Sequence, residues 1–174
     1  MHVDIDEPVE ITTYDARWPS WYANDAAEVR QVLGSRVQAL EHFGSTAIVG
    51  LVAKPIIDIL VAPVRWPLDP ADRRSLESLG YQYLGEANVP GREYFRRRSS
   101  HATNLAVVEW GSPLWRDNIT VRDYLRSHPE VAASYGQTKL RVWTDGARTL
   151  LGYSEAKSSH IGSLVAAAKR WRAA

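Results

Sequence analysis

Hydrophobic positions in the first half of the chain follow two different spacings. Between residues 15 and 33 apolar side chains recur every three or four residues, which predicts a helix that ends before Gly34. Residues 69–79 repeat this helical spacing behind Asp69, an N-cap residue. Short apolar or alternating runs predict five strands, at 36–43, 55–62, 81–84, 93–98 and 102–108.

The second half of the chain is predicted to be helical. Apolar spacing there predicts three helices, over 114–127, 129–145 and 153–168. Mixed strands and helices followed by helices alone favour an α+β fold. We expect residues 1–174 to form a single domain, with a sheet-containing half at 8–110 and a helical half at 112–172.

Composition and charge narrow the class of protein. A length of 174 residues suits one domain, and 45% hydrophobic and 24% charged residues are ordinary for a folded chain. The net charge of +1 argues against a polynucleotide or a membrane surface as partner. Because the chain has no cysteine, disulfides and thiolate zinc sites are excluded. The absence of cysteine also favours a cytoplasmic location, and the acidic N-terminus shows no signal-peptide features. No oligomeric state is predicted.

Asp58 is the most unusual position, because it places a carboxylate inside the apolar run from Ile56 to Val61. An ionised group in such a strand costs several kcal/mol unless something compensates it. Three compensations are open: a bound metal ion, an ion pair with Lys54 or an arginine, or a place at the end of the strand facing a cleft. Alternation along a strand puts Asp58 and Leu60 on the same face.

The bend Gly44-Ser45-Thr46 precedes this strand and has complementary chemistry. Gly44 permits close approach of the backbone, while Ser45 and Thr46 offer hydroxyls and backbone N–H groups to an anion. A phosphate at the bend and a metal at Asp58 would form the arrangement that phosphoryl transfer requires. Bends of this composition are also common as ordinary turns.

The stretch HFGSTAIVGLVAKPIIDILV, from His42 to Val61, resembles the hallmark of the GrpB family. Gly44-Ser45 followed by Asp58 is also similar to the signature of the DNA polymerase β-like nucleotidyltransferase superfamily. Other segments resemble the GrpB family too: Gly85-Glu86 with Gly91 to Phe95, Val121 to Arg126 with His128-Pro129, and the pairs Tyr135/Lys139 and Tyr153/Lys157. The resemblance implies a minimal nucleotidyltransferase-like fold, a small mixed sheet flanked by helices with its cleft at Gly44-Ser45.

Two positions depart from the patterns of these families. Nucleotidyltransferases carry a second acidic residue where this chain has Leu60, and the His-x-His of the GrpB pattern is reduced to His101 with Thr103 in the second place. Asp58, Glu41 and His101 remain the candidate catalytic groups and metal ligands. Mg²⁺ is the expected ion, or Mn²⁺ or Zn²⁺ if His101 ligates. A structural histidine and a solvated strand end are the competing interpretations of His101 and Glu41.

Three cations are candidates for contact with an anionic substrate, namely Lys54, Arg92 and Arg122. For Arg122 the competing interpretation is the docking of its helix through ion pairs. The two Tyr/Lys pairs named above have i,i+4 spacing and are interpreted as helix packing, with lysines that extend to solvent.

Three functions are consistent with the sequence. In the first, the bend binds a nucleoside triphosphate, Asp58 holds Mg²⁺, and a nucleotidyl or phosphoryl group moves to a small acceptor. In the second, the site binds a nucleotide or phosphorylated metabolite without catalysis, as Leu60 in place of the second carboxylate suggests. The third is a metal-dependent enzyme of another reaction class that uses Asp58 and His101.

Overall fold

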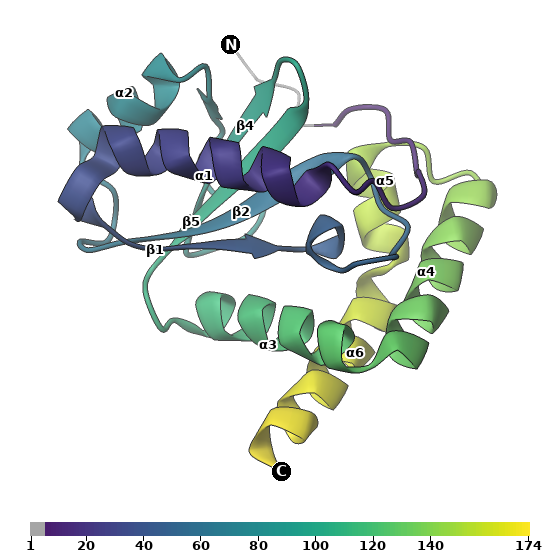
Figure 1. The fold of residues 1–174 in the computed structure, drawn as a ribbon. Coiled ribbons are helices and arrows are strands. Elements are labelled where there is room, and N and C mark those ends of the chain that lie inside the picture. Colours follow the sequence, from purple (N-terminus) through teal and green to yellow (C-terminus); the bar gives the residue numbers. More distant parts are fainter. Residues whose placement is uncertain (1–5) are drawn as a thin grey trace.

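The computed structural model describes residues 6–174, in which a five-stranded sheet lies between helices (Figure 1). The strands are β1 (Val37–Phe43), β2 (Ile56–Pro63), β3 (Gln82–Tyr83), β4 (Arg92–Arg98) and β5 (Ala102–Val108). The α-helices are α1 (Trp18–Leu33), α2 (Pro70–Ser78), α3 (Pro113–Ser127), α4 (Pro129–Thr144), α5 (Leu150–Ala156) and α6 (Ser158–Ala173). The strand order is β1-β2-β5-β4-β3, with β2 and β5 parallel and the other neighbours antiparallel. This confirms the predicted α+β class with a mixed sheet.

The two faces of the sheet bury separate hydrophobic clusters. On one face Ile57, Ile59 and Val61 of β2 pack in a cluster that includes Trp18 and Val29 of α1. On the other face the alternate β2 residues, Leu60 and Ala62, pack with Trp115 of α3. Figure 1 shows α1 and α3 on opposite sides of the sheet. Asp58 alternates with Ile57 and Ile59, so its side chain belongs to the α3 side.

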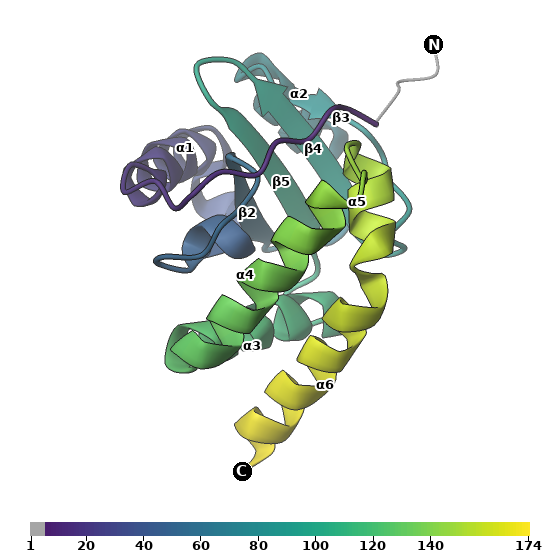
Figure 2. The same ribbon diagram turned by 90° about the vertical axis from the view of Figure 1, so that its right-hand side faces the viewer.

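The helical half covers the end of the sheet where β2 begins, and Figure 2 looks onto α4, α5 and α6 from that side. A third cluster joins these helices to the loop after β1. In it, Ile48 and Leu51 of the loop pack with Leu125 of α3, Tyr135 of α4 and Leu164 of α6. In the part of the chain that the structure describes, no helix combines the length and apolar character needed to cross a membrane.

The prediction of one helix over 153–168 is wrong, because the structure has two. Lys157, with φ −94° and ψ −4°, separates α5 from α6. Helix α5 begins earlier than predicted, where Thr149 Oγ1 accepts a hydrogen bond from the backbone N–H of Gly152 at 3.4 Å. Apolar residues keep helical spacing on both sides of Lys157, so their pattern does not reveal the interruption.

An extended N-terminal arm ties the two halves together. Isolated bridges pair Pro8 with Thr149 and Thr12 with Ala53. The indole Nε1 of Trp143 on α4 donates a hydrogen bond to the carbonyl of Val9 at 2.9 Å. The arm therefore contacts both the loop before β2 and the end of α4.

Candidate functional site

The bend and the strand carboxylate lie side by side. Strands β1 and β2 pair with Phe43 opposite Asp58, so the chain leaves β1 at the level of the carboxylate. Gly44 has a φ of +69°, and a Cβ at this position would lie 2.9 Å from Asp58 Oδ2. Both the conformation and the approach require glycine. The structure thus places Asp58 next to the bend, as the sequence led us to expect.

Asn104 on β5 holds one oxygen of this carboxylate. Parallel pairing sets Asn104 beside Asp58, and its Nδ2 donates a hydrogen bond to Asp58 Oδ1 at 2.9 Å. Arg98 in turn donates from Nη2 to Asn104 Oδ1 at 3.1 Å and pairs with Glu7 at 2.5 Å. This series of contacts orients Asp58 and leaves Oδ2 on the side of the bend.

Three of the four lysines in the chain lie around Asp58. Lys54 precedes β2, Lys139 is on α4, and Lys157 lies between α5 and α6. Burial is the largest influence on all three and lowers their pKa values, to about 6 for Lys139 and about 8 for Lys157. The negative charge of Asp58 raises each of these pKa values, whereas Lys54 lowers those of the other two lysines. Asp58 thus acts on all three amines, and Glu7 is a second carboxylate that raises the pKa of Lys54.

Two of these lysines rest on tyrosine rings. Lys139 Nζ lies 5.1 Å from the ring centre of Tyr135, and Lys157 Nζ lies 4.4 Å from that of Tyr153. Lys139 is only 1% exposed, and its Nζ donates to the carbonyl oxygen of Val52. The interpretation of these lysines as groups that extend to solvent is therefore wrong for Lys139, whose amine points into the protein.

Arg92 approaches the same site from β4. Its guanidinium donates hydrogen bonds to the carbonyls of Ala87 at 2.8 Å and Glu86 at 3.2 Å, and lies 4.4 Å from the ring centre of Tyr94. Burial lowers the pKa of Arg92, while the charges of Tyr94 and Asp58 raise it. Among residues 6–174 no carboxylate forms an ion pair with Arg92. It remains a candidate for contact with an anionic ligand.

The two hydroxyls of the bend have different surroundings. Thr46 is 2% exposed, and its Oγ1 lies 3.0 Å from Nε2 of His42, so this hydroxyl is used within the protein. Ser45 is half-buried and forms a hydrogen bond with Tyr135, which partly opposes the burial that raises the tyrosine pKa to about 12. Gly44 and Ser45 also border a cavity of about 160 Å³ between β1, α3, α4 and α6.

Glu41 and Arg122 bind each other. Arg122 Nη1 lies 2.6 Å from Glu41 Oε2 and also donates to the carbonyl of His42 at 3.2 Å. A second ion pair at 2.8 Å joins Arg122 to Asp123. Burial lowers the pKa of Arg122, but its hydrogen bonds with Glu41 and Asp123 outweigh this effect and the pKa is raised. These contacts fit the docking of α3 onto β1, and they occupy the carboxylate of Glu41, which pairs across the strands with Leu60, two residues from Asp58.

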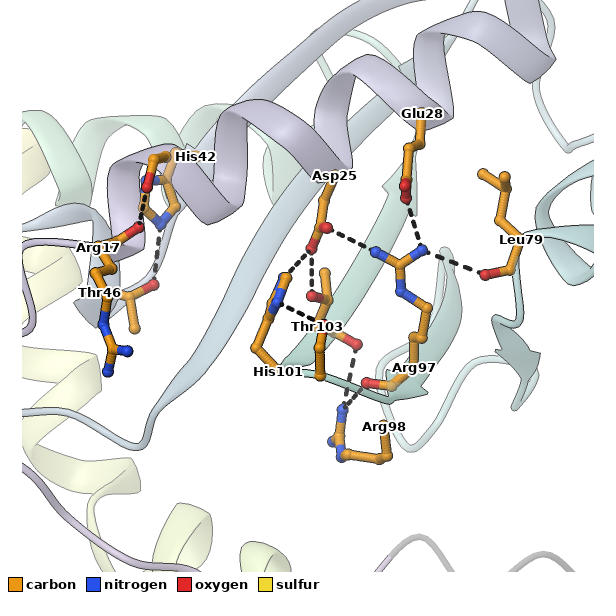
Figure 3. Close-up of polar contacts among 12 residues, drawn as sticks. Arg17, Asp25, Glu28, His42, Thr46, Leu79, Arg97, Arg98, His101 and Thr103 are labelled. Carbon is orange, nitrogen blue, oxygen red and sulfur yellow. Dashed lines mark hydrogen bonds and ion pairs between the residues drawn. The ribbon is translucent and has the colours of Figure 1, made fainter.

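His101 belongs to a different cluster, on the α1 side of the sheet (Figure 3). Its Nε2 lies 2.9 Å from Oδ2 of Asp25, which also accepts a hydrogen bond from Thr103. Arg97 pairs with the other oxygen of Asp25 at 2.6 Å. The ring of His101 stacks on Trp21 at 4.8 Å. All of these partners lie on the face opposite to Asp58.

The expected metal ligands are therefore not brought together. Asp58 lies beside the bend, Glu41 is paired with Arg122, and His101 is paired with Asp25 on the other face. Within residues 6–174 no group of three or more histidine, cysteine, aspartate or glutamate residues is placed to hold a metal ion. Within residues 6–174, Asp58 Oδ2 is a carboxylate oxygen beside the bend that accepts no hydrogen bond.

Sequence reasoning missed Asn104, Lys139 and Lys157 as members of the site. A signal for the lysines was present, because the chain has four lysines among 21 lysine and arginine residues. The choice of lysine at these positions is informative, since lysine loses its proton on burial far more readily than arginine. Asn104 gave a weaker signal, as a polar residue inside the apolar strand at 102–108.

The chain is similar to a known protein family over most of its length. The model of the family described as GrpB protein matches residues 8–167. The chain belongs to the GrpB family. A crystal structure of the conserved protein GrpB from Enterococcus faecalis has a TM-score of 0.84 and 27% identity, and the match covers 93% of this chain and 99% of that one.

GrpB relatives among curated proteins confirm the assignment. The glutamate-rich protein GrpB of Alkalihalophilus pseudofirmus is 31% identical, over 75% of this chain and 79% of that protein. The UPF0157 protein YqkA of Bacillus subtilis is 29% identical over 99% of this chain, which spans only 50% of YqkA. A weaker structural match, to a cytoplasmic RNA terminal U-transferase, has a TM-score of 0.49 and 15% identity and does not bear on function.

Proposed function

We propose that the protein binds a phosphorylated small molecule, in the first place a nucleotide, at the site formed by Gly44, Ser45 and Asp58. The observation that supports this is a group of basic side chains that outnumber the carboxylates near them: the charge of Asp58 raises the pKa values of Lys54, Lys139, Lys157 and Arg92, and Glu7 also acts on Lys54. Buried cations without enough counter-charge are unfavourable. An anionic ligand supplies the missing charge, and a glycine bend is a common place for it.

Mg²⁺ enters this proposal together with the nucleotide. The donor set does not form a metal site by itself, because it has one available carboxylate oxygen amid several cations. Mg²⁺ in nucleotide sites takes most of its ligands from phosphate and water and adds one or two carboxylates. Asp58 is the residue that would contribute such a carboxylate, and the ion would then neutralise phosphate charge.

A second candidate function is the transfer of a nucleotidyl or phosphoryl group to a small acceptor. The favouring observation is Lys139, whose pKa of about 6 leaves a neutral amine at neutral pH. In this reaction the acceptor oxygen forms a bond to phosphorus and its proton moves to Lys139 Nζ. The bond to the leaving group breaks, and this group is pyrophosphate in nucleotidyl transfer and a nucleoside diphosphate in phosphoryl transfer. Leu60 in place of a second carboxylate makes this the weaker candidate.

Thermal shift measurements with ATP, pyrophosphate and inorganic phosphate test binding. A ligand at 100 times its Kd adds about 2.7 kcal/mol of stability, which is readily detected. We expect the shift with ATP to fall in Lys139→Gln and to persist in Lys169→Gln, because Lys169 is exposed and pairs with Asp117 at 2.8 Å. Repeating the series with and without Mg²⁺ tests whether the ion accompanies the nucleotide. No shift with any of the three compounds would overturn the proposal.

Proton uptake gives a more specific signature. Burial lowers the pKa of Lys139 to about 6, and an anion beside it raises this pKa, so binding near pH 7 should be accompanied by net proton uptake. Titration calorimetry in two buffers of different ionisation enthalpy measures this uptake. Uptake that persists unchanged in Lys139→Gln contradicts the assignment of the proton to Lys139.

Release of pyrophosphate, which accompanies nucleotidyl transfer, or of ADP, which accompanies phosphoryl transfer, separates the two candidate functions. If ATP binds and nothing is released with a panel of small hydroxyl and amine acceptors, binding alone is the function supported. If release occurs, Asp58→Asn should abolish it while ATP binding remains measurable.

A further inference from the structure

A second and larger cavity, of about 830 Å³, lies beside the loop that follows the bend. We call it the loop cavity. Its wall consists of loop residues 46–52, Tyr22 and Pro19 of α1, Arg126 at the end of α3, and one side of α4 from Pro129 to Leu140. Its lining contains neither Asp58 nor any of the three lysines around it. It is therefore separate from the proposed phosphate site, although the same loop borders both.

The interior and the mouth of the loop cavity are mainly apolar. Ile48 and Leu51 lie in its wall, each 3% exposed. Val49 and Leu140 also line the cavity, and at 81% and 42% exposed they are among the most exposed large apolar side chains of the described chain. Cavities of this size and character are typical of sites for small molecules. Exposed apolar side chains beside such a cavity commonly mark a binding surface.

One end of the loop cavity carries Arg126, which forms no direct ion pair within residues 6–174. Burial and Arg122 lower its pKa, while the charges of Asp123 and Glu41 raise it. Arg126 donates from Nε to the carbonyl of Ala47 at 3.0 Å. The neighbouring Arg122 is fully engaged with Glu41 and Asp123. His42 on the cavity wall adds no charge, because burial and then Arg126 and Arg122 lower its pKa to about 4.

We propose that the loop cavity binds an apolar carboxylic acid, with the carboxylate on Arg126 and the apolar part along the loop and α4. Charge complementarity selects the head group, since the guanidinium has terminal N–H donors to pair with a carboxylate. The apolar wall selects the rest of the ligand, because burying it removes apolar surface from water. The inference rests on these contacts alone and not on the proposed phosphate site.

Octanoate is a suitable probe, with octylamine as its counterpart of opposite charge. We expect the intact protein to bind octanoate with a Kd of about 1 mM or tighter by titration calorimetry or NMR. Arg126→Gln should weaken octanoate binding about tenfold, the usual loss for one charge-assisted pair. Arg116→Gln is the matched control, because Arg116 is exposed on the same helix and does not line the cavity. Binding in that variant should equal that of the original protein.

A second variant keeps the test independent of charge. Ala133 lines the loop cavity and is exposed, so Ala133→Phe should fill the mouth and reduce octanoate binding without loss of folding. Saturating ATP should leave octanoate binding unchanged, which distinguishes this cavity from the phosphate site. Equal affinities for octanoate and octylamine, or equal octanoate affinities of Arg126→Gln and Arg116→Gln, would overturn the proposal.

Discussion

A Cβ added at Gly44 would lie only 2.9 Å from Oδ2 of Asp58, so the bend and the acid form one structural unit. The pairing of Phe43 with Asp58 across β1 and β2 places the bend beside the acid. The positive φ of Gly44 then turns the backbone toward the carboxylate. No larger residue fits here without displacing Asp58. Any ligand held by the backbone of the bend is consequently also next to this acid.

Gly44→Ala should destabilise the protein more than the same change at Gly50. Both glycines have positive φ, but a Cβ at Gly50 would meet nothing within 4 Å. We expect the free energy of unfolding to fall by about 2–4 kcal/mol for Gly44→Ala and by about 1 kcal/mol for Gly50→Ala. Urea unfolding measures both. Equal losses would mean that strain alone, and not the contact with Asp58, requires glycine at position 44.

Lys139→Met should make the stability of the protein less dependent on pH. Burial lowers the pKa of Lys139 from 10.5 to about 6 in the folded state, so the unfolded state binds more protons between these values. Stability therefore rises with pH in this interval, by up to about 1.4 kcal/mol per pH unit. Urea unfolding from about pH 6.5 to about pH 9 should show a shallower rise for Lys139→Met. In Lys139→Met, part of the rise in stability with pH should remain above pH 8, because the pKa of Lys157 is lowered to about 8 in the folded state.

Identical slopes for the original protein and Lys139→Met would show that Lys139 stays charged in the folded state. Its low pKa could then not support a role in proton uptake or transfer.

Asp25→Asn should be much more damaging than Glu28→Gln. Both carboxylates pair with Arg97, but the side chain of Asp25 is 3% exposed whereas that of Glu28 is 49% exposed. Loss of the buried partner should cost about 3–5 kcal/mol, and loss of the exposed one about 1 kcal/mol or less. Thermal or urea unfolding compares them. If the Asp25 variant is too unstable to measure, His101→Asn can be used to test the same cluster. This variant should leave ATP binding intact, because His101 lies on the face of the sheet opposite to Asp58.

Glu41→Gln should lower stability slightly and leave ligand binding unchanged. The side chain of Glu41 is 41% exposed, so its ion pair with Arg122 should contribute about 0.5–1 kcal/mol. Urea unfolding measures this loss, and the ATP thermal shift measures binding in the same variant. Loss of the Mg²⁺ effect on ATP binding in Glu41→Gln would instead return Glu41 to the site as a metal ligand.

Local features of the fold could be predicted from the sequence. The strand expected at 102–108 has those bounds in the structure, and Asp69 caps α2 by accepting a hydrogen bond from the N–H of Ala71 at 2.8 Å. Spacing and capping act over a few residues, so neighbouring residues in the chain suffice to predict them. The interruption at Lys157 was missed because it does not change the apolar spacing.

The members of the site were less predictable. Asp58 stands out in the sequence because an ionised group in an apolar strand is unfavourable unless something compensates its charge. His101 and Glu41 lie on or beside neighbouring strands, which favours grouping them with Asp58. In the structure His101 pairs with Asp25 on the opposite face, and Glu41 pairs with Arg122 of α3. Lys139 was interpreted as packing, because helical spacing does not show which surface covers a helix face.

The sequence by itself determined the α+β class and most of the helices and strands, because apolar spacing and capping involve residues close together in the chain. It also indicated that a glycine bend accompanies an acid, because both belong to one motif. The tertiary structure decided which charged groups share a face and how deeply they are buried. Strand register set Asn104 beside Asp58 and His101 on the opposite side, and the packing of α4 and α5 over the start of β2 brought in Lys139 and Lys157. Burial in that packing, rather than residue type, lowers the pKa values of these lysines.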